Sequence, residues 1–271
     1  MKLPYFSFGL MVIIAAIAFS GGLSASEESF VVNFPDVDFE AVIREHINKP
    51  DGDILNTDLE GLTSMLCYGD DIESIEGIQY CVDLEELHFC GISRNFIDLS
   101  PLIGMENLNC VVVHGTSISD ISIFAEMTQL DSLLLFGNQI SDLSPLSELE
   151  NLVGLCLQHN KISNIEPLCN LVNLQTLQVN INQIDDITPL AGLASLRTLN
   201  LSNNNIKDIT VLSGLGSLYR LELNNNEISD LSPLLQLQNL TFLDVEGNPL
   251  SDDSIDSVIP ALEARGVHVR Y

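Results

Sequence analysis

Residues 151–171 read NLVGLCLQHNKISNIEPLCNL, and the same arrangement returns as NLQTLQVNINQIDDITPLAGL (173–193), SLRTLNLSNNNIKDITVLSGL (195–215) and SLYRLELNNNEISDLSPLLQL (217–237). The leucine that opens each copy recurs every 22 residues from Leu108 to Leu240, and Leu62 and Leu84 extend the series upstream, with two extra residues before Leu108. A single copy is too short to bury its own apolar side chains, so the copies must stack. The period predicts an elongated fold of about nine copies over residues 62–247.

Each copy follows the pattern L-x-x-L-x-L-x-x-N-x-I, which is the leucine-rich repeat. We number the positions of a copy from its opening leucine. Positions 1, 4 and 6 are expected to point into the core from a short strand, and positions 11, 14, 17 and 20 to close the core from the other side. Proline at position 16 of four copies favours tight turns or 3₁₀ segments there. The predicted fold is an α/β leucine-rich-repeat solenoid with one curved parallel sheet on its concave side, turns and 3₁₀ segments on its convex side and a helical N-terminal cap. The two extra residues are expected to bulge around Gly91 to Asn95.

Two polar residues recur at fixed positions. Asn at position 9 is expected to bond backbone groups of its own coil and of the neighbouring coil, so that the column forms a ladder. Asp at position 13 is expected to cap the turn that follows it, although the same column could hold calcium. The members are Asn138, Asn160, Asn182, Asn204, Asn226 and Asn248 at position 9, and Asp120, Asp142, Asp186, Asp208, Asp230 and Asp252 at position 13.

The open ends of such a stack need covers. Residues 27–61 are predicted to form a helical N-terminal cap, because FPDVDFEAVIREHI (34–47) places apolar side chains on one helical face behind a capping Asp36 or Asp38. Residues 248–271 are predicted to form the C-terminal cap. It consists of a helix over 252–265 with Ile255, Ile259 and Leu262 inward, kinked or restarted at Pro260, and a last strand at 267–269.

The first 26 residues resemble an export signal. Lys2 is their only charged residue, Gly9 to Phe19 form an apolar run, and small residues follow to Ser26. This order predicts a cleavable secretory signal over residues 1–26, with an uncleaved anchor as the alternative. Because no second apolar span follows, the mature chain is expected to be secreted or extracytoplasmic, in the periplasm or at the cell surface, and not inserted in a membrane.

Composition excludes several classes of function. The chain has 38 acidic and 10 basic residues and a formal charge of −28, which disfavours nucleic acid or an acidic membrane as partner and favours a soluble monomer. The motifs G-x-S-x-G, H-E-x-x-H and the P-loop are absent, so we expect no catalytic residues, no enzymatic activity and no cofactor.

Histidines and cysteines gather in the early strands. His88, Cys90 and His114 are expected to be neighbours on the outer face of the sheet, but three ligands on an open surface are a weak metal site, and we predict none. Cys67 and Cys81 occupy core positions within one coil, and the sequence leaves open whether they are bridged.

The concave face changes character along its length. Positions 5 and 7 alternate with the inward positions and should point outward. They are mostly apolar or aromatic in the N-terminal copies and become polar and then acidic. We call the N-terminal group the N-terminal patch and predict that it binds a partner protein, since exposed apolar patches mark partner surfaces. The patch consists of Leu66, Tyr68, His88, Val112, His114, Leu134 and Phe136.

Two alternatives to this interpretation remain. The patch could be covered by the segment before the repeats or by self-association. The polar C-terminal half of the same face could instead bind a carbohydrate or another cell-surface ligand through Gln178, Asn180, Asn200 and Asn224.

The sequence resembles the internalin class of secreted bacterial leucine-rich-repeat proteins. The resemblance covers nearly the whole mature chain. It rests on the 22-residue period, the segment ISDLSPL at 140–146 and 228–234, the helical unit before Leu62 and the ending NPLSDDSID…IPALEARGV. It implies a curved solenoid that binds proteins on its concave strands. No immunoglobulin-like domain or wall-anchoring tail follows the repeats in this sequence, so a role in host invasion is not expected to carry over.

Overall fold

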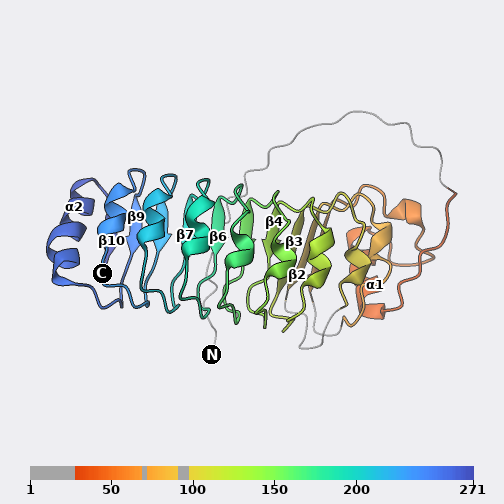
Figure 1. Ribbon diagram of the computed structural model, residues 1–271. Coiled ribbons are helices and arrows are strands. Elements are labelled where there is room, and N and C mark those ends of the chain that lie inside the picture. The colour runs from red at the N-terminus through yellow and green to blue at the C-terminus, as the bar shows by residue number, and fades with distance from the viewer. Residues whose placement is uncertain (1–27, 69–71, 91–97) are drawn as a thin grey trace, which may run out of the picture.

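The computed structural model describes residues 28–68, 72–90 and 98–271. Over these residues ten strands form one parallel sheet, and each strand is hydrogen-bonded to the next in sequence order. They stack side by side along the long axis of the molecule, with the helical turns on one side of them (Figure 1). The strands are β1 Ser64–Tyr68, β2 Glu86–Cys90, β3 Cys110–His114, β4 Ser132–Leu134, β5 Gly154–Cys156, β6 Thr176–Gln178, β7 Thr198–Asn200, β8 Arg220–Glu222, β9 Phe242–Asp244 and β10 His268–Arg270.

The insertion of two residues does not interrupt the sheet. Strands β2 and β3 pair over five positions, from Glu86 opposite Cys110 to Cys90 opposite His114. The expected bulge at Gly91 to Asn95 lies outside the described residues. The prediction of a single continuous sheet is confirmed.

A 3₁₀ segment returns the chain on the convex side of the eight copies that open at Leu62 to Leu218, and prolines lie in the first turn of several of these segments as the sequence predicted. Proline suits the start of such a turn because its φ is fixed and the first N–H groups have no partner within the turn. The segments are η2 Ile78–Tyr80, η3 Ser100–Leu102, η4 Ser122–Glu126, η5 Ser144–Leu146, η6 Glu166–Leu168, η7 Thr188–Gly192, η8 Thr210–Gly214 and η9 Ser232–Gln236.

Apolar side chains from the two sides meet in one continuous core. In the copy that opens at Leu130, Leu133 and Leu135 reach it from the strand, and Leu143 and Leu146 reach it from the convex side, each at most 1% exposed. The predicted inward positions are therefore correct.

The asparagines at position 9 form the expected ladder between coils. Asn182 Oδ1 accepts the Ile162 N–H at 2.9 Å, and its Nδ2 donates to the carbonyls of Leu157 and Val179 at 3.0 Å each. One side chain thus satisfies two groups of the preceding coil and one of its own. The same pattern recurs at Asn160, Asn204, Asn226 and Asn248.

A second row of side-chain bonds lies at position 22, just before the opening leucine, and sequence reasoning missed it. Asn107 Nδ2 donates to the Val82 carbonyl at 2.8 Å, and Asn151 Nδ2 donates to the Thr128 carbonyl at 2.8 Å. Asn239 repeats the contact on the Gly216 carbonyl. Where asparagine occupies position 22, its amide ties the coil to its predecessor on the flank opposite the position-9 ladder.

Position 13 carries turn caps. Asp142 Oδ1 accepts the Ser144 N–H at 2.9 Å, and Oδ2 accepts the Ser144 hydroxyl at 2.9 Å. Asp120, Asp186, Asp208 and Asp230 accept the N–H two residues ahead in the same way. Asp252 is the exception, because it lies at the start of the C-terminal helical segment.

The N-terminal end of the stack is covered by α1 (Val37–His46) and the short η1 (Asn56–Asp58). Asp36 caps α1 through Oδ1, which accepts the Asp38 and Phe39 N–H groups, while Oδ2 accepts the Glu73 and Ser74 N–H groups. One carboxylate therefore starts the helix and fixes it to the first repeat. Phe39, Val42 and Ile43 are buried, as the helical face predicted.

The C-terminal cap differs from the prediction in which of its helical side chains face the core. Residues 254–258 form a π-helical turn, η10 (Ser254–Val258), and α2 (Ile259–Ala264) begins directly after it with Pro260 in its first turn. Proline has no N–H to continue the α-helical ladder, and the wider turn accommodates this loss. As a result Ser254 and Val258 point inward and Ile255, expected inside, is 41% exposed. Gly266, at φ +90°, ends the helix before β10.

No helix within the described residues is long and apolar enough to cross a membrane. The predicted signal, residues 1–26, lies outside the described residues.

Candidate functional site

Parallel register aligns the outward side chains of successive strands. Leu66, His88, Val112, Leu134 and Cys156 occupy equivalent places on β1 to β5. The row continues with Gln178, Asn200, Glu222 and Asp244 on β6 to β9. The N-terminal patch therefore exists as a contiguous surface, and the change from apolar to acidic follows the sheet.

The exposure of the patch is uneven. Leu66 is 44% and Tyr68 52% exposed, whereas His88, His114, Leu134 and Phe136 are half-buried. Val112, expected to be an exposed contact, is only 7% exposed. It is smaller than His88 and Leu134, its neighbours in register, and a concave surface brings such neighbours together over it. Val112 thus forms the floor of the patch.

Leu66 and Tyr68 contact helix α1 at the free edge of β1. The Tyr68 hydroxyl donates to Glu45 Oε2 at 3.0 Å, and the Leu66 N–H donates to His46 Nε2 at 3.2 Å. The hydrogen bond to the Glu45 carboxylate raises the pKa of Tyr68. Helix α1 therefore covers the edge of the sheet but leaves the outer surfaces of Leu66 and Tyr68 open.

An aromatic pair lies at the other end of the patch. The rings of His114 and Phe136 stack with centroids 4.6 Å apart and planes 8° apart. Burial lowers the pKa of His114, so the neutral imidazole is favoured against the phenyl ring. The pair forms a flat apolar surface beside Leu134.

The polar half of the face is partly engaged with itself, through Asn200 and Asn224, whereas Asn180 Oδ1 is buried without a hydrogen-bond partner among the described residues. Asn200 Nδ2 donates to Glu222 Oε2 at 3.1 Å, and Arg220 forms an ion pair with the same carboxylate group at 2.7 Å. The Arg220 guanidinium also lies 4.2 Å from the centroid of the Phe242 ring. Asn224 accepts a hydrogen bond from Ser202. Position 3, which carries Arg220 and Phe242, was missed as part of this face, although it alternates in phase with positions 5 and 7.

Burial keeps several of the cysteine thiols in their protonated form. All six are free, including the buried Cys67 and Cys81. Burial raises the pKa of the thiols of Cys67, Cys81 and Cys110 to about 12, so they are protonated at neutral pH. Cys90 and His114 are neighbours in register as expected. Within the described part of the chain, no three His, Cys, Asp or Glu side chains are grouped so as to hold a metal ion.

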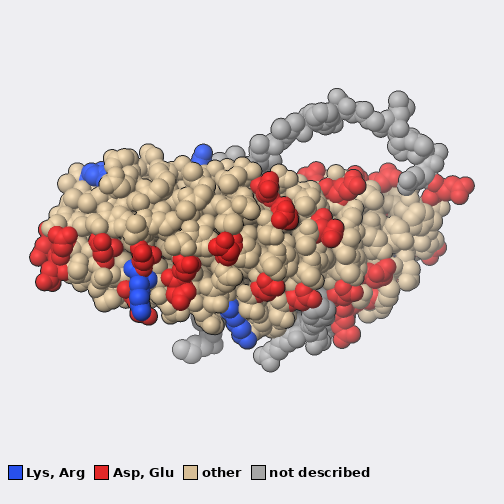
Figure 2. Space-filling view, in the orientation of Figure 1, with Lys and Arg blue, Asp and Glu red and all other residues tan. Residues whose placement is uncertain are grey.

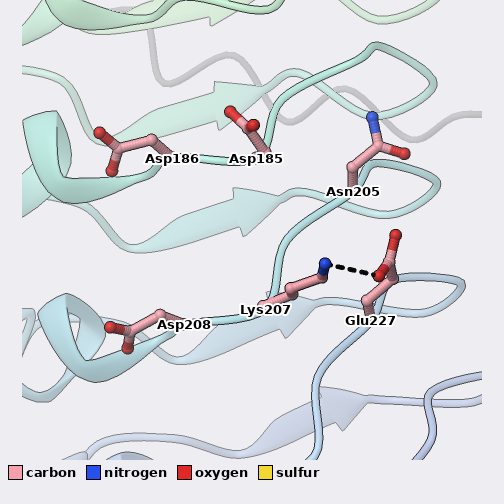
Figure 3. Close-up of a pocket in the computed structure, with 6 residues that line it drawn as sticks. All are labelled: Asp185, Asp186, Asn205, Lys207, Asp208 and Glu227. Atoms are coloured by element: carbon pink, nitrogen blue, oxygen red, sulfur yellow. Dashed lines mark ion pairs between the residues drawn. The ribbon is translucent and has the colours of Figure 1, made fainter.

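Acidic side chains occur along the whole length of the face that carries the helical turns, and Lys and Arg are few there (Figure 2). One open recess on the flank is lined by Asp185, Asp186, Asn205, Lys207, Asp208 and Glu227 (Figure 3). Lys207 and Glu227 form an ion pair at 3.1 Å. Asp186 and Asp208 are committed to capping the turns at Thr188 and Thr210, so the recess is explained by turn formation.

Comparisons with known proteins agree with this architecture. A family model described as leucine-rich repeats in two copies matches residues 150–192 and 194–235. No curated protein sequence matches the chain. Among solved structures, internalin C2 from Listeria monocytogenes is 35% identical, with a TM-score of 0.72 over 78% of this chain and 93% of that one.

Two further structures extend the comparison. An internalin, InlF, also from Listeria monocytogenes, is 27% identical, with a TM-score of 0.53 over 88% of each chain. A leucine-rich-repeat protein from Leptospira interrogans is 22% identical, with a TM-score of 0.68 over 80% of this chain and 62% of that one, and shares the fold. The identity and coverage of internalin C2, together with the repeat match, show that this chain belongs to the internalin-like family of bacterial leucine-rich-repeat proteins.

Proposed function

We propose that the protein is a secreted, non-catalytic binding module that holds a partner protein against the N-terminal patch. The observation that carries this proposal is the alignment of apolar and aromatic side chains across β1 to β4 on an open face. A solvated sheet face has no need of such a group, and solenoids of this kind typically bind along their concave surface.

The anchors of the contact are the exposed Leu66 and Tyr68 at one end and the half-buried Leu134 and Phe136 at the other. Strand spacing of about 4.8 Å places β1 and β4 about 14 Å apart, a distance that one partner element can span. Aromatic and aliphatic anchors in such a surface carry most of the binding free energy.

Selection of a random-peptide library displayed on phage, with residues 27–271 as immobilised target, tests the site. The triple variant Leu66→Ser, Tyr68→Ser and Phe136→Ser should lose binding of the selected peptides by at least about 30-fold, because each anchor contributes on the order of 2 kcal/mol. The control is the double variant Val82→Ser with Val172→Ser. These two valines lie away from the concave face and are 60% and 49% exposed, so the variant removes apolar surface elsewhere on the molecule.

The control should bind as the wild type does, and both variants should keep the thermal unfolding transition of a folded solenoid. Selected peptides that tolerate the triple variant would contradict the proposal. Recognition of a glycan array, lost on Asn200→Ala with Asn224→Ala, would favour the polar half of the face instead.

The proposed secretion rests on residues 1–26. Expression of the full chain in a bacterium, followed by mass spectrometry of the exported protein, should find an N-terminus close to Glu27. An Ile13→Asp with Ala16→Asp variant breaks the apolar run and should stay inside the cell with its N-terminus intact. Export of that variant would rule out residues 1–26 as the signal.

A further inference from the structure

We infer that the partner surface that meets the N-terminal patch is basic, with lysine or arginine side chains flanking its apolar contact. The inference rests on the proposed function and adds the chemistry of the partner. It is carried by three carboxylates around the patch and by the absence of a cation paired with them among the described residues.

The first carboxylate lies within the face itself. Glu86 is at position 3 of β2, two residues before His88 on the same side of the strand, and it is half-buried in register between Ser64 and Cys110. Asp131 is exposed and immediately precedes β4. Cys110 on β3 is in register with Glu86 on one side and with Ser132, the residue after Asp131, on the other, so both carboxylates border the starts of the strands that carry the patch.

The third carboxylate, after Glu86 and Asp131, lies at the outer edge of the patch, beside β1. Glu45, at the end of α1, is exposed and accepts the hydrogen bond from Tyr68. The three acidic groups therefore border the patch at the starts of its strands and at its outer edge. A partner cannot cover Tyr68 and His88 without approaching Glu45 and Glu86.

The ion pairs of the described chain lie elsewhere. Arg44 and Lys49 pair with Glu40 and Asp58 in the N-terminal cap. At the far end of the concave face, Arg220 pairs with Glu222, and Arg270 pairs with Asp244 and Glu246. Glu222, Asp244 and Glu246 at the C-terminal end of the concave face thus have arginine partners, whereas no described cation forms an ion pair with Glu45, Glu86 or Asp131.

This distribution decides between partner surfaces. A neutral apolar surface would bury the Glu86 carboxylate further without a counter-charge, which is costly. An acidic surface would be repelled by a chain of formal charge −28. A basic surface gains attraction during approach and pairs these carboxylates on contact.

The test uses isosteric removal of charge. The variant Glu45→Gln, Glu86→Gln and Asp131→Asn removes the three charges around the patch. The control Glu148→Gln, Glu150→Gln and Glu166→Gln removes three exposed charges outside the concave face and changes the net charge by the same amount. The probes are synthetic copies of the phage-selected peptides, whose association is followed by stopped-flow fluorescence at low and high salt.

We expect peptides selected on the wild type to be enriched in Lys and Arg next to aromatic or aliphatic residues. Association with the patch variant should be about tenfold slower at low ionic strength, since steering by charge changes on-rates by ~10-fold or more. The difference should vanish near 1 M salt, where the screening length is only about 3 Å. The control variant should associate as the wild type does.

Selected peptides without an excess of Lys and Arg would overturn the inference. So would an association rate that falls equally in the patch variant and in the control variant. If binding is lost on Leu66→Ser, Tyr68→Ser and Phe136→Ser but is unaffected by the patch-charge variant, the concave-face function stands and the basic partner is wrong. A library that yields no peptide dependent on the patch counts against both.

Discussion

Single polar residues connect the copies of this solenoid by satisfying the backbone of a neighbouring coil. The position-9 asparagines do so on one flank and the position-22 amides on the other. The first row could be predicted, because an asparagine at a fixed place after a strand has few other partners. The second was missed, although asparagine recurs at position 22 in four copies, because serine stands there in others, as at Ser195 and Ser217, and hides the pattern. The burial of Val112 could not be predicted, because it depends on its neighbours in space.

Asn182→Ala should lower the free energy of unfolding by about 1–3 kcal/mol, since it leaves the Ile162 N–H without a partner and removes one of the two amide donors to the Leu157 carbonyl, which keeps Asn160 Nδ2. Chemical denaturation of the variant measures the loss. Gln183→Ala, which changes an exposed neighbouring amide, is the control and should be neutral. An unchanged midpoint for Asn182→Ala would show that water replaces the ladder without cost.

The turn caps predict an acid-dependent stability. Hydrogen bonds from Ser144 hold the pKa of Asp142 below its usual value, so its contribution is present above the unfolded carboxyl pKa of about 3.9 and is lost as the pH falls through the lower folded value. Asp142→Asn keeps an acceptor for the Ser144 N–H but does not titrate. The difference in Tm between wild type and Asp142→Asn should therefore shrink from neutral pH to below about pH 4. Asp53→Asn, at an exposed site of the N-terminal cap, is the control. A Tm difference between wild type and Asp142→Asn that does not change with pH would contradict a turn cap at Ser144.

At the scale of elements, periodicity predicted the strands and the convex turns, because each must repeat its contacts in every copy. The caps are not repeated, and there the sequence was less informative. The phase of α1 was correct because Asp36 starts a regular helix. The phase of the C-terminal cap was wrong at Ile255, because the π-helical turn before Pro260 shifts which side chains face the core.

The C-terminal cap depends on a buried hydroxyl. Ser254 is 1% exposed, its Oγ donates to the Ser229 carbonyl at 2.8 Å and accepts the Leu231 N–H at 3.0 Å. Ser254→Ala should destabilise the protein by about 1–3 kcal/mol, because the buried Leu231 N–H loses its partner, while the Ser229 carbonyl keeps only the Ser251 N–H. Thermal unfolding compared with Ser257→Ala, an exposed serine of the same turn, measures it. Equal Tm values for the two variants would mean that the cap does not depend on this contact.

At the scale of the whole molecule, the site is a property of neighbouring copies. The N-terminal patch and the carboxylates around it come from several different strands, which the parallel register brings together. The covered edge of the sheet comes from β1 and α1. Sequence columns could place the N-terminal patch for this reason. They could not give the partial burial of the patch. They could not give the ion pairs that Arg220 and Arg270 form with carboxylates of the concave face either, because both features depend on side-chain conformation.

Because each coil contacts chiefly its neighbours, one whole copy should be removable. Deletion of residues 174–195 joins equivalent positions, so Asn204 would take the place of Asn182 against the Leu157 carbonyl. The shortened chain should unfold in one cooperative transition at a lower Tm. Deletion of residues 174–194 shifts every later apolar side chain by one position and should give no cooperative transition in circular dichroism. Cooperative unfolding of both chains would contradict a strict register between coils.

The position-9 ladder also has a consequence for the gene. Its contacts are identical from one coil to the next, so recombination between misaligned copies preserves them whenever it adds or removes whole blocks of 22 codons. Such an event leaves α1 and the terminal helix in place and changes only the distance between them. The length of the concave face can therefore vary between descendants in discrete steps, while point mutations at positions 3, 5 and 7 change the side chains that it presents.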